Sequence, residues 1–113
     1  MQEELKKLSV SESLERYIVD LVFASREPQK HGLSEIDKYI QYGASPRASL
    51  HLHAGSRALA FLEGRDYVLP EDIKSIAMDV LNHRISLHYE AEAEGISSRD
   101  IVSELLKRIP IGR

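Results

Sequence analysis

The stretch Gly43-Ala44-Ser45-Pro46-Arg47-Ala48-Ser49 (GASPRAS) predicts the start of a helix. Gly43 would supply the turn, Ser45 the N-cap, and Pro46 the first helical position, where a missing N–H costs nothing. Arg47 then falls in the first turn, where the helix macrodipole disfavours a cation by about 0.3–1 kcal/mol. A guanidinium beside free helix amides suits an anion such as phosphate. The alternative is a surface arginine paired with a carboxylate, for instance from residues 90–94.

A second helix of this chain also begins with a proline and obeys the macrodipole rule. Pro70 is followed by Glu71 and Asp72, two carboxylates in the first turn. Its predicted buried stripe is Ile73, Ile76, Ala77, Val80 and Leu81. The two helix starts therefore differ in the sign of their first charges, and both interpretations of Arg47, a phosphate contact and a paired surface arginine, stay open.

The remaining periodicity predicts two further amphipathic helices. Ser9-Val10-Ser11-Glu12 matches a capping box and precedes one apolar face, Leu14, Tyr17, Ile18, Leu21 and Val22. Ser97-Ser98-Arg99-Asp100 caps the last helix, which Pro110 ends, with an apolar face of Ile101, Val102, Leu105, Leu106 and Ile109.

The helix from about Pro46 to Glu63 is rich in small residues, with Leu52, Leu59, Phe61 and Leu62 as its bulk. Gly55 in its middle costs roughly 1 kcal/mol against Ala and suggests the close approach of a neighbouring backbone. Residues 26–43 form a long connection with room for one helical turn around 34–38 and a short strand at 39–42. Ile85, Leu87 and Tyr89 alternate with polar neighbours, a weak strand signal.

These elements predict a mainly α fold, a compact bundle of about four helices with one or two very short strands at most. Its domain is expected at residues 9–110, after a polar lead-in (1–8) and before a short tail (111–113). The 113 residues suit one core, and the 42% hydrophobic and 29% charged content is typical of a globular chain. Without Cys there is no disulfide framework, Cys-based zinc site or thiol nucleophile.

Charge and hydropathy argue against nucleic acid and membrane as partners. The net charge is −3 and both halves of the chain are slightly acidic, which disfavours a broad nucleic-acid surface. No apolar run approaches the roughly 20 residues that span a bilayer, and residues 1–8 lack the apolar core of a signal peptide. The default expectation is a soluble, cytoplasmic protein.

Two clusters of titratable residues are candidate sites. His51 and His53 are two apart on a predicted helix, so they point about 200° apart and cannot chelate one metal ion together. We predict no metal site.

Glu90, Glu92 and Glu94 would share one face in a strand, where their mutual repulsion would favour binding of a cation or a basic partner. In a helix or loop the three side chains would splay. They form either a solvated edge or a contact strip.

Motifs for phosphoryl transfer are missing. The chain contains no G-x-x-x-x-G-K-[ST] phosphate loop, and no aliphatic run ending in Asp-Glu to hold Mg²⁺. It is therefore expected to be inactive as an enzyme on its own.

Three blocks, residues 42–49 (YGASPRAS), 58–85 (ALAFLEGRDYVLPEDIKSIAMDVLNHRI) and 89–96 (YEAEAEGI), resemble the C-terminal helical lid domain of MoxR-family AAA+ ATPases. Their order and spacing make the resemblance specific, and it extends from about Val10 to Pro110. It implies that the chain is an excised lid, or the C-terminal third of a larger ATPase whose AAA+ core carries the phosphate loop. ATP and Mg²⁺ would then bind the full-length protein, and neither would bind this chain alone.

The resemblance assigns Arg47 the sensor-2 role, a contact from the lid to the γ-phosphate of ATP, with Ser45 and Pro46 building the helix start. It also places Tyr17 and Ile18 of the first lid helix on the adenine side. Where family members often have Thr or Ser capping the third helix, this chain has Leu69, so no hydroxyl cap is expected there.

The resemblance further implies a core domain on the same polypeptide, neighbouring subunits in a ring, commonly a hexamer, and a chaperone-like role in maturing or inserting cofactors into partners. Some such partners have von Willebrand A domains. Two alternatives stay open at this point. One is a freestanding helical adaptor for protein partners without a nucleotide function. The other is a helix-turn-helix DNA binder, which the acidic charge disfavours.

Overall fold

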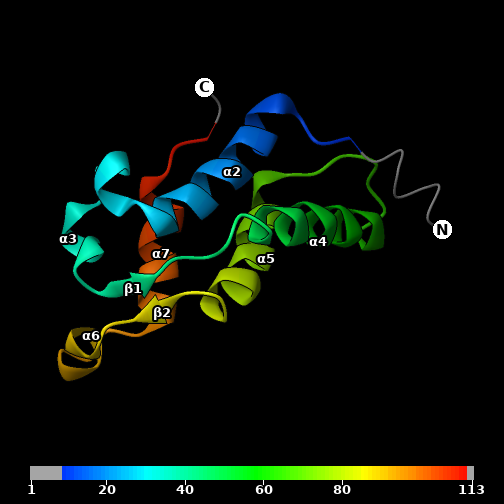
Figure 1. Ribbon diagram of the computed structural model, residues 1–113. Coiled ribbons are helices and arrows are strands. Elements are labelled where there is room, and N and C mark those ends of the chain that lie inside the picture. Colours follow the sequence, from blue (N-terminus) through cyan, green and yellow to red (C-terminus); the bar gives the residue numbers. More distant parts are fainter. Residues whose placement is uncertain (1–8, 112–113) are drawn as a thin grey trace.

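The computed structural model describes residues 9–111, so the predicted lead-in and the last two residues of the tail lie outside it. Figure 1 labels its main elements, which are α2 (Glu12–Arg26), the 3₁₀ helix η1 (Pro28–His31), α3 (Ser34–Asp37), β1 (Ile40–Tyr42), α4 (Ala48–Leu62), α5 (Pro70–Asn82), β2 (Ser86–Leu87), α6 (Tyr89–Ala93) and α7 (Ser98–Arg108). The prediction of a mainly α fold with very short strands is confirmed. The four predicted helices are α2, α4, α5 and α7, and α3 is the predicted single turn.

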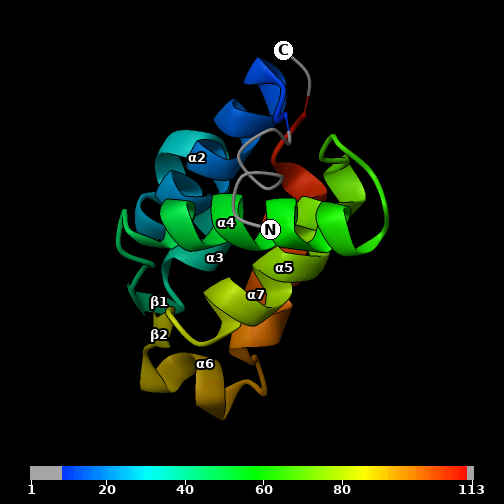
Figure 2. The ribbon, with the colours of Figure 1, turned by 90° about the vertical axis from the view of Figure 1, so that its right-hand side faces the viewer.

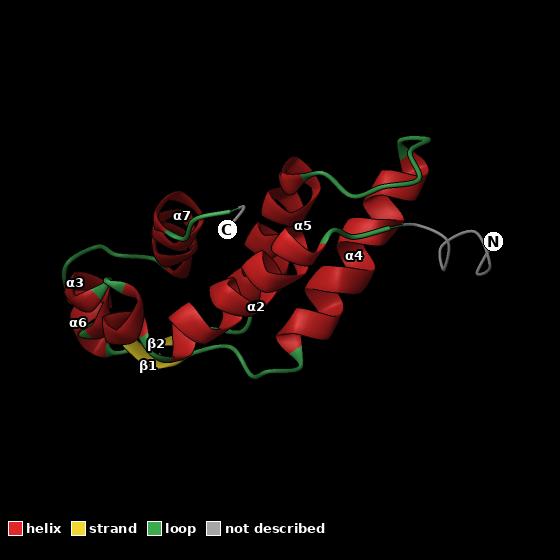
Figure 3. Cartoon of the chain, turned by 90° about the horizontal axis from the view of Figure 1, so that it is seen from above, coloured by secondary structure: helices red, strands yellow, loops and turns green. Residues whose placement is uncertain are grey.

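The four long helices enclose the core. α4 packs on α5, α5 on α7, and α2 on α4, and α2, α5 and α4 run next to one another in Figure 3. The predicted apolar face of α2 is fully buried, as are Ile73, Ala77 and Leu81 of α5 and Ile101, Val102 and Leu105 of α7. In α4 the prediction is only partly right: Leu52 is buried, but Leu62 is 80% exposed.

The start of α2 differs from the predicted capping box. Its N-cap is Ser11, whose hydroxyl accepts a hydrogen bond from the Leu14 N–H at 3.3 Å. Ser9 forms a parallel bridge to Tyr67, in which its N–H donates to the Asp66 carbonyl and its own carbonyl accepts from Val68. The prediction of Ser9 as the cap is therefore wrong, because a distant segment uses its backbone.

The close approach predicted at Gly55 is present, but a side chain makes it. A Cβ atom built on Gly55 would lie 2.7 Å from Cγ2 of Ile76 on α5. This is shorter than carbon atoms can pack, so the glycine lets α4 and α5 come together. The prediction of a neighbouring backbone is wrong in that detail.

Residues 26–43 contain more structure than predicted, since η1 precedes α3. β1 follows as predicted and pairs with β2 in an antiparallel two-stranded sheet, in which Ile40 lies opposite Leu87 and Tyr42 opposite Ser86. The strand signal after residue 84 is thus confirmed only for β2, because Tyr89 already begins a helix.

The acidic segment after β2 is helical. Glu90 and Glu92 lie in α6, and Glu94 follows it, so the three carboxylates splay instead of sharing one strand face. Ala91 is fully buried beneath this turn, and Glu94 accepts a 2.8 Å hydrogen bond from the Tyr39 hydroxyl. α6 lies at the end of the molecule opposite the first turn of α2, as Figures 1 and 2 show.

The helix starts at α5 and α7 are capped by their own residues. At α5 the Asp72 carboxylate accepts from the Leu69 N–H at 2.8 Å, so the carboxylate half of a capping box is present and, as expected, no hydroxyl half accompanies it. At α7 Ser97 and Asp100 cap each other reciprocally, as predicted. α7 ends at Arg108 because Ile109, which precedes Pro110, is extended (φ −81°, ψ 122°).

Candidate functional site

The start of α4 is tighter than a capped α-helix. The chain first makes a turn, in which the Ala48 N–H donates to the Ser45 carbonyl at 2.9 Å and the Ser49 N–H to Pro46 at 3.1 Å. α4 begins at Ala48, Arg47 occupies its N-cap position, and no side-chain hydrogen bond caps this end among the described residues. The prediction of Ser45 as a capping side chain is wrong, and so is Pro46 as the first helical residue.

This turn changes the source of positive charge at the helix start. The amides of Ala48, Ser49 and Leu50 all donate to carbonyls three residues back, at 2.9–3.1 Å. Few free amides are left to bind an anion, although free amides were part of the prediction. The Arg47 guanidinium is therefore the main positive group at this end of α4.

Two residues of α2 fix the segment before Arg47. The Ser25 hydroxyl donates to the Val22 carbonyl at 2.6 Å and accepts from the Ala44 N–H at 3.0 Å. Arg26 donates to the Ala44 carbonyl at 3.3 Å, and Ala44 is fully buried. Hydrogen bonds to both the N–H and the carbonyl of Ala44 hold the approach to α4 in place.

Gly43 permits this arrangement. A Cβ atom on Gly43 would overlap the carbonyl oxygen of Ser25 and come within 2.6 Å of the Arg26 Cα. The glycine is needed for the approach of two backbones, and not for the turn that the sequence predicted. Sequence reasoning missed Ser25 and Arg26, since nothing local links them to a residue 18 or 19 positions away.

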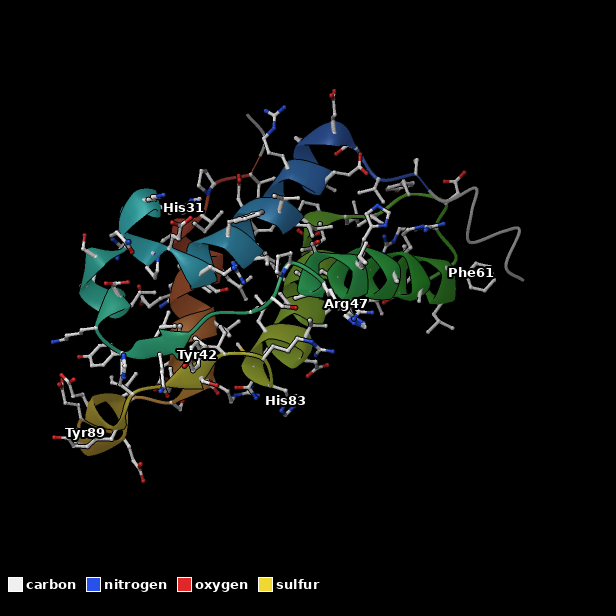
Figure 4. All side chains as sticks on the ribbon, viewed as in Figure 1. His31, Tyr42, Arg47, Phe61, His83 and Tyr89 are labelled. Carbon is white, nitrogen blue, oxygen red and sulfur yellow. The ribbon has the colours of Figure 1, made fainter. Side chains whose placement is uncertain are left out.

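Arg47 is exposed at the start of α4 (Figure 4). Within residues 9–111, the five ion pairs are Lys30–Glu27, His53–Glu15, Arg65–Asp72, Arg108–Glu35 and Arg108–Glu104, so none includes Arg47. Glu94 is hydrogen-bonded to Tyr39 instead. The alternative of a pair between Arg47 and the acidic segment is thus not realised in the described part of the chain.

Tyr17 and Ile18 lie in the core and not beside Arg47 at the surface. They are 1% and 2% exposed, and the Tyr17 hydroxyl is buried without a hydrogen-bond partner among the described residues. Burial raises the pKa of Tyr17 to about 12. The large apolar side chains that α2 does expose are Val19 (42%) and Phe23 (41%).

The histidines are dispersed. His53 Nε2 lies 3.5 Å from Glu15 Oε2, which links α4 to α2 when the imidazole is protonated. His31 and His83 lie on opposite sides of the molecule in Figure 4. Over residues 9–111 no group of three His, Asp or Glu side chains is arranged to hold a metal ion.

Comparison with known proteins agrees with the fold. Residues 33–105 match the AAA lid domain family. The chain is 39% identical over 111 residues to the chaperone MoxR1 of Mycobacterium tuberculosis, covering 98% of this chain and 29% of that protein. It is 40% identical over 92 residues to the protein MoxR of Paracoccus denitrificans, covering 76% of this chain and 27% of that protein.

A solved structure matches almost the whole chain. It is the crystal structure of a candidate ATPase from Cytophaga hutchinsonii, with a TM-score of 0.94 and 54% sequence identity, covering 99% of this chain and 34% of that one. The chain thus spans about a third of the length of the proteins that it matches. Separately, no helix in the described range is long and apolar enough to cross a bilayer.

Proposed function

The chain belongs to the AAA lid domain family, and from this premise we propose that it is the sensor-2 lid of a MoxR-like AAA+ ATPase. Its work would be to contribute to ATP binding and to convert the state of the nucleotide into motion. The observation that carries the proposal is Arg47: an exposed guanidinium that no carboxylate of residues 9–111 pairs with, held on a segment that two hydrogen bonds and a glycine contact fix to α2.

The nucleotide site would be shared between two domains. An AAA+ core on the same polypeptide would bind ATP and Mg²⁺, since the chain contains no phosphate-loop motif. Arg47 fits the part left to the lid, because an exposed guanidinium can donate two N–H groups to one phosphate. Bound ATP supplies the charge and the cleavable phosphate, and the lid supplies a cation at a fixed place.

Lid motion follows from this division. With the γ-phosphate present, its attraction to Arg47 favours an arrangement in which lid and core are closed on the nucleotide. Once that phosphate leaves, Arg47 loses its partner and the closed arrangement loses stabilisation. Because the helix start is tied to α2, the pull on Arg47 is transmitted to the helical bundle as a rigid body.

On the adenine side, exposed residues of α2 are better placed than Tyr17 and Ile18. Tyr17 and Ile18 are covered by other residues of the bundle, so a base that packs against α2 would meet exposed side chains first. Val19 and Phe23 are apolar, exposed and one helical turn apart on α2. We propose them as the contact, with Tyr17 and Ile18 supporting the helix from beneath.

The wider setting is proposed by analogy with the relatives. MoxR1 of Mycobacterium tuberculosis is designated a chaperone, which supports a chaperone-like role in maturation or cofactor insertion. Ring assembly, contacts with neighbouring subunits, partners with von Willebrand A domains and a cytoplasmic location belong to the same proposal.

Replacing Arg47 in the complete ATPase tests the proposal. We expect Arg47→Ala to lower ATP hydrolysis by about tenfold or more, because a charge-assisted phosphate contact is lost, while circular dichroism and melting temperature stay unchanged. Arg99→Ala is the matched control, since Arg99 is an exposed arginine in the first turn of α7. Equal activity of wild type and Arg47→Ala would refute the phosphate role.

An adaptor function is the second candidate, and one observation favours it. α4 exposes Leu50 (68%) and Leu62 (80%), two large apolar side chains that could serve a protein partner. If Leu50→Asp abolishes binding of a client protein while Arg47→Ala leaves ATP hydrolysis intact, the adaptor hypothesis replaces the hypothesis of a nucleotide function.

A further inference from the structure

A second arginine, Arg84, lies on the segment that enters the small sheet at the end where the Arg47 segment leaves it. β1 and β2 are antiparallel, with Tyr42 opposite Ser86. The chain leaving β1 and the chain entering β2 therefore lie at the same end of the sheet. Arg47 follows Tyr42 by five residues, and Arg84 precedes Ser86 by two. In Figure 4 the labelled Arg47 lies at the start of α4, and the labelled His83, the residue before Arg84, lies lower in the same view.

Both backbones are held at this end of the sheet. On one side Ala44 is fixed to Ser25 and Arg26. On the other, the Arg84 N–H donates to the Leu81 carbonyl at 3.0 Å, and Ile85 is 8% exposed. α5, which ends just before Arg84, packs along α4, which begins just after Arg47. The positions of both arginine segments are thus set by hydrogen-bonded and packed elements at this end of the sheet.

The charge of Arg84 is not neutralised within the described residues. None of the five ion pairs in residues 9–111 includes it, and its side chain is exposed. Its Nη1 donates to the Val80 carbonyl at 3.2 Å, at the end of α5, where a cation also suits the macrodipole. A guanidinium has five N–H donors, so this bond leaves donors for a further acceptor.

An anion that binds between two exposed cations gains from both charges and removes their mutual repulsion. We propose that Arg84 is a second phosphate-binding residue for the nucleotide triphosphate that Arg47 contacts, and that the two arginines together distinguish ATP from ADP. The proposal rests on the proposed function of Arg47. The alternative is that Arg84 only caps α5.

Nucleotide affinity of the complete ATPase tests this proposal. Binding of a non-hydrolysable ATP analogue and of ADP is measured by calorimetry for wild type, Arg47→Gln, Arg84→Gln, the double variant and Arg99→Gln. We expect Arg84→Gln to weaken binding of the ATP analogue by about tenfold and of ADP by less than roughly threefold, as a charge-assisted hydrogen bond to the terminal phosphate would. Arg99→Gln should change neither affinity.

The other outcomes separate the two proposals. If Arg47→Gln weakens binding of the ATP analogue and Arg84→Gln leaves it within roughly twofold, the role of Arg84 is refuted and that of Arg47 stands. If neither variant changes the affinity, the proposed function fails and this inference fails with it. If Arg84→Gln lowers the melting temperature and weakens both nucleotides equally, Arg84 only caps α5.

Discussion

The starts of α4 and α5 both carry a proline but are stabilised by different parts of the chain. At α5 the Asp72 carboxylate accepts from the Leu69 N–H and pairs with Arg65 through two contacts of 2.7 and 2.8 Å. All these partners lie within eight residues. At α4 no side chain of the described residues caps the helix, and Arg26 and Ser25 of α2 hold Ala44 from 18 and 19 positions away.

The difference separates a self-sufficient helix start from one that depends on tertiary contacts. The start of α7 offers a comparison for the charge of Arg47. Arg99 also lies in the first turn of its helix, but Asp100 stands next to it and caps Ser97. A cation near a helix start is therefore not in itself a sign of function. Arg47 differs because its helix start has no acidic residue in its first turn and no capping side chain from residues 9–111.

The largest expected effect concerns the self-sufficient start. Asp72→Ala removes a cap and leaves the guanidinium of Arg65, whose side chain is only 20% exposed, without its partner. We expect the free energy of unfolding in urea to fall by about 3 kcal/mol near neutral pH. A loss below about 1 kcal/mol would mean that this ion pair is not what stabilises the start of α5.

The pH dependence identifies the cause of that loss. The hydrogen bonds from Arg65 hold the pKa of Asp72 below its usual 3.8. Because the pKa of Asp72 is lower in the folded state, its ionised carboxylate stabilises the fold at any pH above the pKa of the unfolded chain. This stabilisation is lost as the pH falls through the pKa of the folded state. The difference in free energy of unfolding between wild type and Asp72→Ala should therefore decrease below about pH 4 and stay constant from about pH 6 to 8.

A smaller effect is expected at the dependent start. Gly43→Ala places a methyl group against the Ser25 carbonyl, so the segment before α4 must move away from α2. We expect a loss of about 2 kcal/mol in urea unfolding, together with reduced nucleotide response of the complete ATPase. Ser45→Ala is the control, and because the Ser45 hydroxyl caps no helix in the described part of the chain, the substitution should change stability by less than about 0.5 kcal/mol. A larger loss for Ser45→Ala than for Gly43→Ala would reverse our account of this helix start.

Much of the fold could be predicted because the spacing of apolar residues along the sequence indicates the long helices. Buried residues three and four apart define α2, α5 and α7, and Ser97 with Asp100 marks the start of α7 within four residues. The errors occur where a distant segment decides. Ser9 and Ser11 both fit a helix cap, and only the bridge from Ser9 to Tyr67 excludes Ser9.

The candidate site divides in the same way. Arg47 could be found from the sequence, since its charge stands out beside a proline. Ser25 and Arg26 could not, because their partner Ala44 is brought to them by residues 27–43. In the sequence, Arg84 is a basic residue just after a helix end, a position typical of a C-terminal cap. Only the pairing of β1 with β2 brings it to the end of the sheet that leads to Arg47.

The central claim is that Arg47 meets the terminal phosphate of ATP in the complete protein. An ATP analogue with a photoreactive group on its γ-phosphate, irradiated in the complete ATPase and mapped by mass spectrometry, tests this contact directly. We predict an adduct on residues 43–49 that excess ATP prevents and that ADP prevents less well. Labelling elsewhere on the protein with none on residues 43–49 would contradict the account.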